Sequence, residues 1–344
     1  MTALELRYEA GAVHLPGLGL WLDARRRQQG PERVFVSHGH SDHIAAHREV
    51  IVTAPTARFL GARLKGQRRE HILPFGTPTQ FAGAARGYQL TLQAAGHILG
   101  SAMAFIEAGD QSLLYTGDFK LRAGLAAEPC APRHADILVM ETTFGRPQFR
   151  FPPAAATWEE IIGFCRRTLV EGGTPVLLGY PLGKSQELVC GVSAAGLPVM
   201  VGTEIHRLTQ IYREFIPGFP NPARFDPEQA RGRVLVFSPQ ARLPAAVERC
   251  GPLRTAACTG WAIEPGARFR YGTDAAFPLS DHADFGELVQ FVRLVAPRQV
   301  YTLHGYAAAF AQTLRDLGWA AQALSEPDQL GLPLVWPDAP RDLH

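Results

Sequence analysis

The sequence is poor in cysteine, and its few cysteines follow no regular spacing. Its 344 residues include only five, Cys130, Cys165, Cys190, Cys250 and Cys258, with no C-x-x-C pair. This pattern argues against a disulfide framework and against a cysteine-based zinc site, because both need clustered or regularly spaced thiols. A reducing, cytoplasmic setting is therefore expected.

Long apolar runs are also missing. The stretch from Met1 to Pro16 has no apolar core of the kind that marks a signal peptide. No window of the sequence approaches the roughly 20 consecutive apolar residues that a membrane-spanning helix needs. We therefore expect a protein without a membrane segment.

A strong net charge is lacking as well. Charged residues make up 19% of the chain and the formal net charge is only +2. Bulk charge therefore does not indicate a nucleic-acid-binding protein, and any basic surface must be local. Two short basic clusters exist, Arg25–Arg27 and Lys65 with Arg68 and Arg69, and a solvated surface is the simpler interpretation of each.

Motifs for a side-chain nucleophile or a nucleotide are absent. The chain has no G-x-S-x-G turn. The segment Gly179–Ser185 resembles a phosphate-binding loop, but three residues separate its glycines where four are required. It is rejected as a nucleotide site. Lys184 could still face a phosphate of the substrate, although a solvated lysine at the start of a helix explains it equally well.

What the sequence does contain is a substantial core and two kinds of pattern. With 46% hydrophobic residues, the chain can bury one large domain or two ordinary ones. Short strands separated by turns are predicted in the first part, and Gly109-Asp110 is typical of a hairpin turn. The predicted strands include Arg33–Ser37, Tyr88–Ala94, Ala102–Glu107, Ser112–Thr116 and Asp136–Glu141.

The pattern changes near Phe149–Pro153, which resembles a linker. A helix is predicted over Thr157–Glu171, with Thr157 as its N-cap and Glu160 completing a capping box. Strand, glycine turn and helix then recur, which favours a small α/β insert with a parallel sheet. Near Ala276 the first pattern returns. The expected domains are thus 1–150 with 276–344, and an insert over 151–275.

The strongest signal is a histidine-rich turn directly after a predicted strand, Ser37-His38-Gly39-His40-Ser41-Asp42-His43. Alternate residues of an extended chain face the same way, so His38 and His40 can point at one cation. The following turn brings Asp42 and His43 to a second position nearby. Imidazole and carboxylate are the usual protein ligands of zinc and similar divalent ions.

Further candidate ligands follow other predicted strands. They are His97 after Tyr88–Ala94, Asp118 after Ser112–Thr116, His304 after Gln299–Leu303, and His282 in Leu279–Asp284. Taken singly, each is more often a turn residue or a satisfied core histidine. Taken together, they can serve two divalent ions, with a carboxylate such as Asp118 bridging both. Two ions about 4 Å apart activate a shared water and clamp a displaced phosphate.

The order and spacing of His38-x-His40-x-Asp42-His43, His97 and Asp118 resemble the metallo-β-lactamase superfamily. That resemblance implies an α/β fold, an αββα sandwich. It also implies that Asp23, after an early strand, supports the site. One ion would be held by His38, His40, His97 and Asp118. The other would be held by Asp42, His43, Asp118 and His304. Two zinc or manganese ions are the expected cofactors.

The second half resembles the β-CASP nucleases of this superfamily. Glu141 in Glu141-Thr142-Thr143-Phe144 is similar to their first additional motif, His282 to the second and His304 to the third. The resemblance implies a small α/β β-CASP insert. It implies that His282, paired with Glu141, protonates the leaving oxygen. Asp42 and Asp23 complete the expected catalytic group. Thr259-Gly260-Trp261 also resembles a segment near the end of that insert.

The β-CASP group contains DNA-repair and RNA-processing enzymes. His304 resembles the RNA branch, whereas Glu141-Thr142-Thr143-Phe144 and Thr259-Gly260-Trp261 resemble the DNA branch. The mixture is most similar to bacterial DNA-ligase-associated exonucleases, which accompany a helicase and a ligase. A DNA exonuclease in repair is therefore the first hypothesis. An RNA 3′-end-processing nuclease is the second.

Two other functions stay open on the sequence alone. One is a small-molecule hydrolase of the same fold, such as a thioesterase or lactonase, although Glu141 and the insert would then have no evident task. The other is an inactive nucleic-acid-binding subunit, although every expected ligand is present. Substrate contacts are expected from Lys184, Thr259 and Trp261, with Phe144, Arg231 and Arg233 as further candidates. Core packing is the simpler explanation of the aromatic residues.

Overall fold

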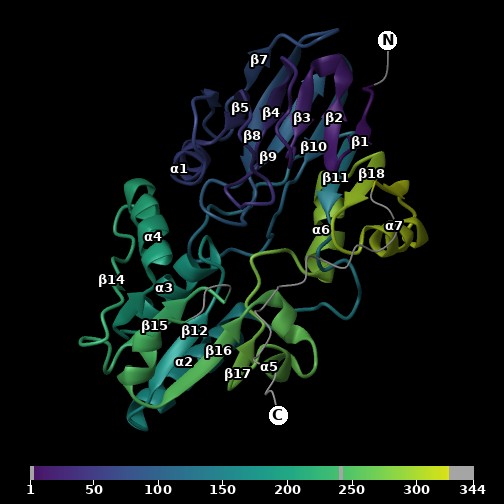
Figure 1. The fold of residues 1–344 in the computed structure, drawn as a ribbon. Coiled ribbons are helices and arrows are strands. Elements are labelled where there is room, and N and C mark those ends of the chain that lie inside the picture. The colour runs from purple at the N-terminus through teal and green to yellow at the C-terminus, as the bar shows by residue number, and fades with distance from the viewer. Residues whose placement is uncertain (1–3, 240–242, 325–344) are drawn as a thin grey trace, which may run out of the picture. The chain divides into compact units, whose positions relative to one another are not determined.

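The computed structural model of the chain describes residues 4–239 and 243–324. The described residues form two compact units (Figure 1). The first contains those up to Arg150 together with those from His282 onward, and the second runs from Phe151 to Asp281. The chain thus leaves the first unit once and returns to it, as an inserted domain does.

Two sheets form the body of the first unit. The first sheet has the strand order β1-β2-β3-β4-β5-β6 and the second has the order β19-β18-β11-β10-β9-β8-β7. The first contains β1 (Arg7–Glu9), β2 (Ala12–Leu15), β3 (Leu20–Leu22), β4 (Arg33–Phe35), β5 (Glu49–Val52) and β6 (Arg69–Ile72). The second contains β7 (Thr79–Phe81), β8 (Tyr88–Ala94), β9 (Ala102–Ala108), β10 (Gln111–Tyr115), β11 (Ile137–Glu141), β18 (Gln299–Leu303) and β19 (Ala321–Ala323).

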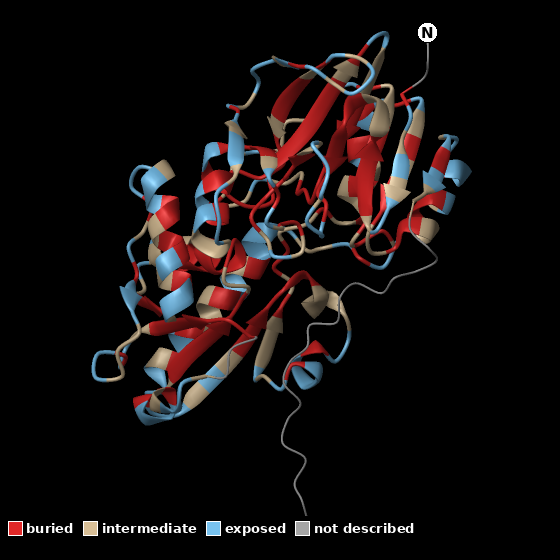
Figure 2. Ribbon diagram, turned by 45° about the horizontal axis from the view of Figure 1, so that its top comes forward, coloured by how far each residue is buried: buried red, intermediate tan, exposed pale blue. Residues whose placement is uncertain are grey.

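These sheets pack face to face, with helices on their outer sides. Alternating apolar residues of both sheets, such as Leu22 and Leu92, share one core. Helix α1 (Ala54–Arg63) covers the outer face of the first sheet. Helices α6 (Phe285–Val295) and α7 (Ala307–Asp316) cover that of the second. Figure 2 shows the strands between these layers as buried. The predicted αββα sandwich of the α/β class is confirmed.

The second unit contains one parallel sheet in the order β14-β13-β15-β12-β16-β17. Its strands are β12 (Thr174–Leu178), β13 (Val199–Val201), β14 (Ala223–Arg224), β15 (Val234–Phe237), β16 (Leu253–Cys258) and β17 (Ala275–Phe277). Its helices are α2 (Ala154–Val170), α3 (Lys184–Ala194), α4 (Thr203–Phe215) and the short α5 (Ala267–Arg270). The small α/β insert predicted from the strand–helix alternation is therefore present. No described helix has both the length and the apolar character needed to cross a bilayer.

The predicted start of the first helix of this unit is wrong. Helix α2 begins at Ala154, after Pro153, and has no side-chain cap. Thr157 lies inside the helix, where its hydroxyl is buried without a hydrogen-bond partner. The alanines at positions 154–156 have the highest helix propensity of any residue, so they extend the helix back to the proline. The capping box with Glu160 therefore does not form.

The strand order explains why the candidate site residues can meet. In the second sheet, β10, β11 and β18 are parallel neighbours, with Tyr115 opposite Val139 and Glu141 opposite Leu303. The carboxyl ends of parallel strands lie at one edge of a sheet. Asp118, Glu141 and His304 therefore emerge together, although they are far apart in the chain.

Helices α2 and α3 pack so closely at Gly191 that a larger residue should not fit there. A Cβ at Gly191 would lie 2.2 Å from the nearest ring atom of Trp158, whereas a Cβ at Gly61 in α1 would meet nothing within 4 Å. We expect Gly191→Ala to lower the free energy of unfolding by about 1–3 kcal/mol through overpacking. The matched control, Gly61→Ala, should raise it by up to about 1 kcal/mol through helix propensity. Urea unfolding measures both, and equal stabilities of the two variants would contradict this packing.

Candidate metal centre

Three imidazoles converge where β4 and β8 end. The Nδ1 atom of His40 lies 3.0 Å from Nε2 of His38 and 3.1 Å from Nε2 of His97. His38 and His97 are buried, with 0% and 4% exposure. A neutral imidazole carries only one N–H, so three ring nitrogens at this spacing suit a shared cation better than one another.

The carboxylate of Asp118 completes this group. Its Oδ2 lies 3.5 Å from His38 Nε2 and 3.3 Å from His43 Nε2. One ligand atom from each of His38, His40, His97 and Asp118 fits within a mutual distance of 4.8 Å. The family resemblance implies that these four residues hold one ion, and the structure brings them together.

A second group of predicted ligands also lies around Asp118. His43 Nε2 is 3.7 Å from an oxygen of Asp42, and the rings of His43 and His304 are 5.9 Å apart. His304 is close enough to Asp118 and His43 for both to affect its pKa. Asp42, His43, Asp118 and His304 are thus neighbours, although they are less tightly grouped than the first four.

Asp23 holds the histidine-rich turn through contacts with Ser37 and His43. Its carboxylate accepts hydrogen bonds from the backbone N–H of Ser37 at 2.7 Å and from the Ser37 hydroxyl at 2.6 Å. It lies 3.0 Å from His43 Nδ1 and accepts a bond from the Tyr115 hydroxyl at 2.9 Å. If His43 donates through Nδ1, its Nε2 is left free to face a cation. Such carboxylate–histidine pairs orient metal ligands.

The loop that carries His97 is fixed at both of its ends. The Ser101 hydroxyl accepts hydrogen bonds from the backbone N–H groups of His97 and Ile98. The hydroxyl of Thr53, the N-cap of α1, donates to the Gly100 carbonyl at 2.6 Å, and Glu128 accepts from the Gly100 N–H at 2.9 Å. These bonds fix the backbone that carries the His97 side chain.

Two glycines allow the backbone to carry the ligands. Gly117, before Asp118, has φ +55°, and a Cβ there would lie 2.5 Å from that of Ser37. Gly305, after His304, has φ +55°, and a Cβ there would lie 2.5 Å from the Cα of Thr143. Any other residue would be strained by its dihedral angle and would also clash.

Burial and charge set the protonation of the group. Burial alone would lower the pKa of His43, but the carboxylates of Asp118, Asp23 and Asp42 raise it well above its usual value. Burial lowers the pKa of His38 well below its usual value, and it lowers that of His304 to about 4. His38 and His304 are therefore neutral at pH 7, which is the form that binds a metal.

Asp118 stays ionised in the same environment. Burial would raise the pKa of its carboxyl group, but the His43 imidazole and the other nearby histidines hold that pKa well below its usual value. A carboxylate together with imidazoles is a ligand set that zinc and manganese accept. The donor types present therefore fit the two divalent ions that the sequence implies.

Glu141 and His282 form a pair beside this group. The Glu141 side chain is buried at 1% exposure, and its Oε1 lies 2.8 Å from His282 Nδ1. The other oxygen of Glu141 accepts a hydrogen bond from the Thr143 N–H at 2.9 Å. Ligand atoms of Asp118, Glu141 and His282 lie within 4.8 Å of one another. The imidazole is thus held beside the Asp118 carboxylate, as a proton donor would need.

The predicted substrate contacts of the second unit have mainly structural surroundings. Lys184 is buried at 1% exposure, 3.2 Å from Glu187 and 3.7 Å from Asp281, so two carboxylates balance its charge. The Thr259 hydroxyl accepts a hydrogen bond from the Trp261 N–H, and Trp261 packs partly buried in a small apolar cluster. These surroundings favour the structural interpretation of all three residues.

The two remaining kinds of candidate contact differ in exposure. Phe144 is buried against Phe149, which favours core packing over base stacking. Arg231 is exposed, and Arg233 is partly exposed with its guanidinium donating to the Gln229 carbonyl. Nothing in the structure assigns either arginine a ligand.

Sequence reasoning missed several residues that position the ligands, namely Ser37, Thr53, Ser101, Tyr115 and Glu128. Ser37 and Tyr115 had a usable signal, because each is a polar group at the end of a strand, one and three residues before a candidate ligand. Thr53 and Glu128 had none, because their partners come from distant parts of the chain.

Two family models match the chain. Residues 18–161 match the model described as the metallo-beta-lactamase superfamily, and residues 275–324 match a Zn-dependent metallo-hydrolase RNA specificity domain. The first range contains the four residues around the first ion position, and the second contains His282 and His304. Both matches therefore fall on the site described above.

Relatives and a solved structure agree with these matches. The chain is 51% identical over 321 residues to a probable DNA ligase of Opitutus terrae, covering 93% of this chain and 31% of that protein. It is 28% identical over 338 residues to the 5′ exonuclease Apollo of Gallus gallus, covering 93% and 68%. It is 35% identical over 164 residues to the transcription termination factor FttA of Methanothermobacter thermautotrophicus, covering 46% and 25%.

Similarity of fold extends further. A crystal structure of a protein of unknown function from Enterococcus faecalis V583 superimposes with a TM-score of 0.56 at 14% identity, covering 86% of this chain and 80% of that one. The chain spans only about a third of the first relative named. The matched models, the αββα fold and the converging ligands lead to one conclusion: the chain belongs to the metallo-β-lactamase superfamily, in its β-CASP group.

Proposed function

We propose that the protein is a metal-dependent nuclease that hydrolyses phosphodiester bonds. Its preferred substrate is DNA, and it acts as an exonuclease. The observation that carries the proposal is the meeting of His38, His40, His97 and Asp118 within 4.8 Å of one another. Beside them lie a paired imidazole and carboxylate, His282 and Glu141. A small-molecule esterase would need the first group, but it has no evident use for the second.

The site residues divide into ligands and supports. When bound, two divalent ions would supply an activated water and positive charge beside a phosphodiester. His38, His40, His97 and Asp118 would hold one ion, and Asp42, His43, Asp118 and His304 the other. Asp23 orients His43 directly and the histidine-rich turn through Ser37. The supports matter because a small displacement of a reacting group has a large effect on rate.

His282 is proposed as the general acid. The buried Glu141 carboxylate lies 2.8 Å from His282 Nδ1, which fixes the orientation of the ring. The side chain of His282 is 21% exposed, so it can meet a substrate. In this position the ring can give its Nε2 proton to the oxygen that leaves when the phosphodiester bond breaks.

Relatives that are named for DNA support a DNA substrate. They include the probable DNA ligase, and a DNA cross-link repair protein of Arabidopsis thaliana that is 23% identical over 318 residues. We further propose that the protein acts in DNA repair in the cytoplasm, together with a helicase and a DNA ligase. The five described cysteines are free thiols, which suits a reducing compartment.

An RNA substrate is the second candidate. The family model that matches residues 275–324 is described as an RNA specificity domain. An endoribonuclease YSH1 of Candida albicans is 34% identical over 105 residues. His304 lies within that segment. A protein that recognises the 2′-hydroxyl should prefer RNA strongly, so matched substrates separate the two candidates.

The proposed activity predicts metal-dependent degradation of labelled single strands. The protein with zinc or manganese should shorten a DNA strand faster than the matched RNA, and a chelator should stop it. Asp118→Ala should lower the rate by at least about 100-fold, because it removes a ligand of both ions. Asp110→Ala, at an exposed hairpin turn, is the matched control and should keep full activity. Absence of cleavage of either strand with zinc, manganese or magnesium would overturn the proposal.

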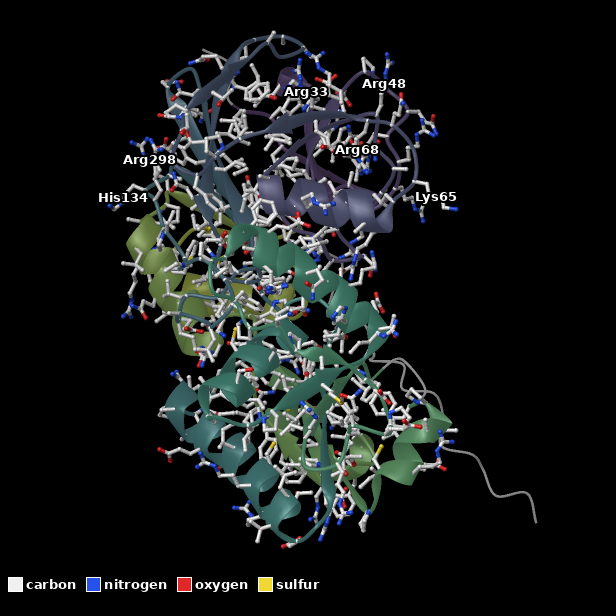
Figure 3. The ribbon with its side chains drawn as sticks, turned by 90° about the vertical axis from the view of Figure 1, so that its left-hand side faces the viewer. Arg33, Arg48, Lys65, Arg68, His134 and Arg298 are labelled. Carbon is white, nitrogen blue, oxygen red and sulfur yellow. The ribbon has the colours of Figure 1, made fainter. Side chains whose placement is uncertain are left out.

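If His282 is the general acid, the loss of rate in His282→Ala should depend on the leaving group of the substrate. Cleavage of an oligonucleotide should slow by about 100-fold or more, because a sugar alkoxide leaves poorly without a proton. Cleavage of bis(4-nitrophenyl) phosphate should change little, because nitrophenolate leaves unprotonated. His134→Ala, an exposed histidine labelled in Figure 3, is the control. Equal losses on both substrates would show that His282 has another role.

The raised pKa of His43 predicts a proton released on metal binding. At pH 7 His43 holds a proton that an incoming cation must displace, whereas the lowered pKa values of His38 and His304 leave those rings neutral. The affinity for zinc should therefore rise with pH across the range 6 to 8. Calorimetry in two buffers of different ionisation enthalpy should detect about one proton, and His43→Gln should abolish it. Affinity that is independent of pH would contradict the assignment.

A further inference from the structure

Two basic clusters of the sequence form one exposed strip on the first unit. Its members are Arg25, Arg26 and Arg27 after β3, Arg48 before β5, and Lys65 and Arg69 between α1 and the start of β6. All six residues are exposed. The metal centre described above uses none of them as a ligand.

The strip is continuous in space. The Arg69 N–H donates to the Arg48 carbonyl at 2.9 Å, because β5 and β6 are parallel neighbours. Burial lowers the pKa of His47, and the guanidinium groups of Arg27 and Arg68 lower it further, so both lie near that ring. In Figure 3, Arg48, Lys65 and Arg68 lie on the same side of the first unit.

Carboxylates do not neutralise this charge. Arg33 and Arg68, at the margin of the strip, pair with Glu49 and Glu70. In contrast, no carboxylate in the described part of the chain forms an ion pair with Arg26, Arg27, Arg48, Lys65 or Arg69. In a chain with a formal net charge of only +2, the strip is a local cluster of positive charge.

The strip begins at the metal centre. Arg25 Nη2 lies 3.3 Å from His304 Nδ1. Arg63, two residues before Lys65, donates a hydrogen bond from Nη1 to the carbonyl of Gly39, which lies between His38 and His40. One strip residue, Arg25, and a residue next to the strip, Arg63, therefore contact the site.

We propose that this basic strip binds the phosphate backbone of a polynucleotide whose scissile bond lies at the metal centre. The inference rests on the proposed nuclease function and adds a second, non-catalytic binding surface to it. Arginine and lysine contacts to phosphates fix the register of a strand without reading its sequence. The strip would thus hold the part of the substrate that extends beyond the cleaved bond.

The test compares two double variants with a control of equal charge. R26Q/R48Q and K65Q/R69Q each remove two charges from the strip, and R293Q/R298Q removes two exposed charges elsewhere on the same unit. Figure 3 shows Arg298 at the opposite edge from Arg48. The readouts are the dissociation constant of a 20-nucleotide fluorescent DNA strand in chelator, its dependence on salt, and the turnover of bis(4-nitrophenyl) phosphate with zinc or manganese.

Each strip variant should bind the strand up to about 25-fold more weakly at 0.1 M salt, because each lost phosphate contact costs roughly fivefold there. The slope of log affinity against log salt should fall by up to about 1.4, from roughly 0.7 per contact. Turnover of bis(4-nitrophenyl) phosphate should stay at the wild-type level, and the control should match wild type throughout.

The outcomes separate the strip from the activity. If the strip variants bind like wild type, with an unchanged salt slope, the proposed role of the strip in binding is wrong. The nuclease proposal would not be affected. A wild-type protein that binds the strand through the strip but cleaves no phosphodiester would overturn the proposed function and not the binding surface. If R293Q/R298Q weakens binding of the strand equally, the effect is one of general charge, and this would also contradict the proposed role of the strip.

Discussion

Buried charge is the constraint on which the metal centre depends. Asp118 is only 7% exposed, and Asp23, at 3%, lies near it. Isolated carboxylates at such depth would be strongly destabilising. Without cations, the protonated His43 compensates for them, held between both groups at 3.0 and 3.3 Å. Two divalent ions would supply that compensation far more fully, so the same arrangement links the stability of the site to its occupation.

Much of the fold and of the ligand set was predictable because the signals are local. Strands Tyr88–Ala94 and Gln299–Leu303 have the predicted bounds, since their apolar periodicity ends at glycine-containing turns. The seven residues of the histidine-rich turn are enough to predict a metal site, and His97, Asp118 and His304 each follow a strand. The family resemblance then related these separate turns to one another, and the structure brings them together.

What could not be predicted depends on contacts between distant segments. Helix α1 escaped prediction because its apolar positions are few, and its N-cap Thr53 matters through the Gly100 carbonyl. The phosphate-facing alternative for Lys184 could not be judged until Glu187 and Asp281 were seen beside it. The arginines of the basic strip looked like two unrelated clusters. They become neighbours only in the folded chain, where β5 pairs with β6 and where Arg27 and Arg68 both lie near His47.

The central claim is that one cluster of imidazoles and carboxylates holds two cations. The most direct test is a crystal structure of the zinc-loaded protein with anomalous diffraction measured at the zinc edge. The account predicts two peaks, one at about 2.0–2.2 Å from ligand atoms of His38, His40, His97 and Asp118. The other should contact Asp42, His43, Asp118 and His304. A single peak, or peaks away from Asp118, would contradict the account.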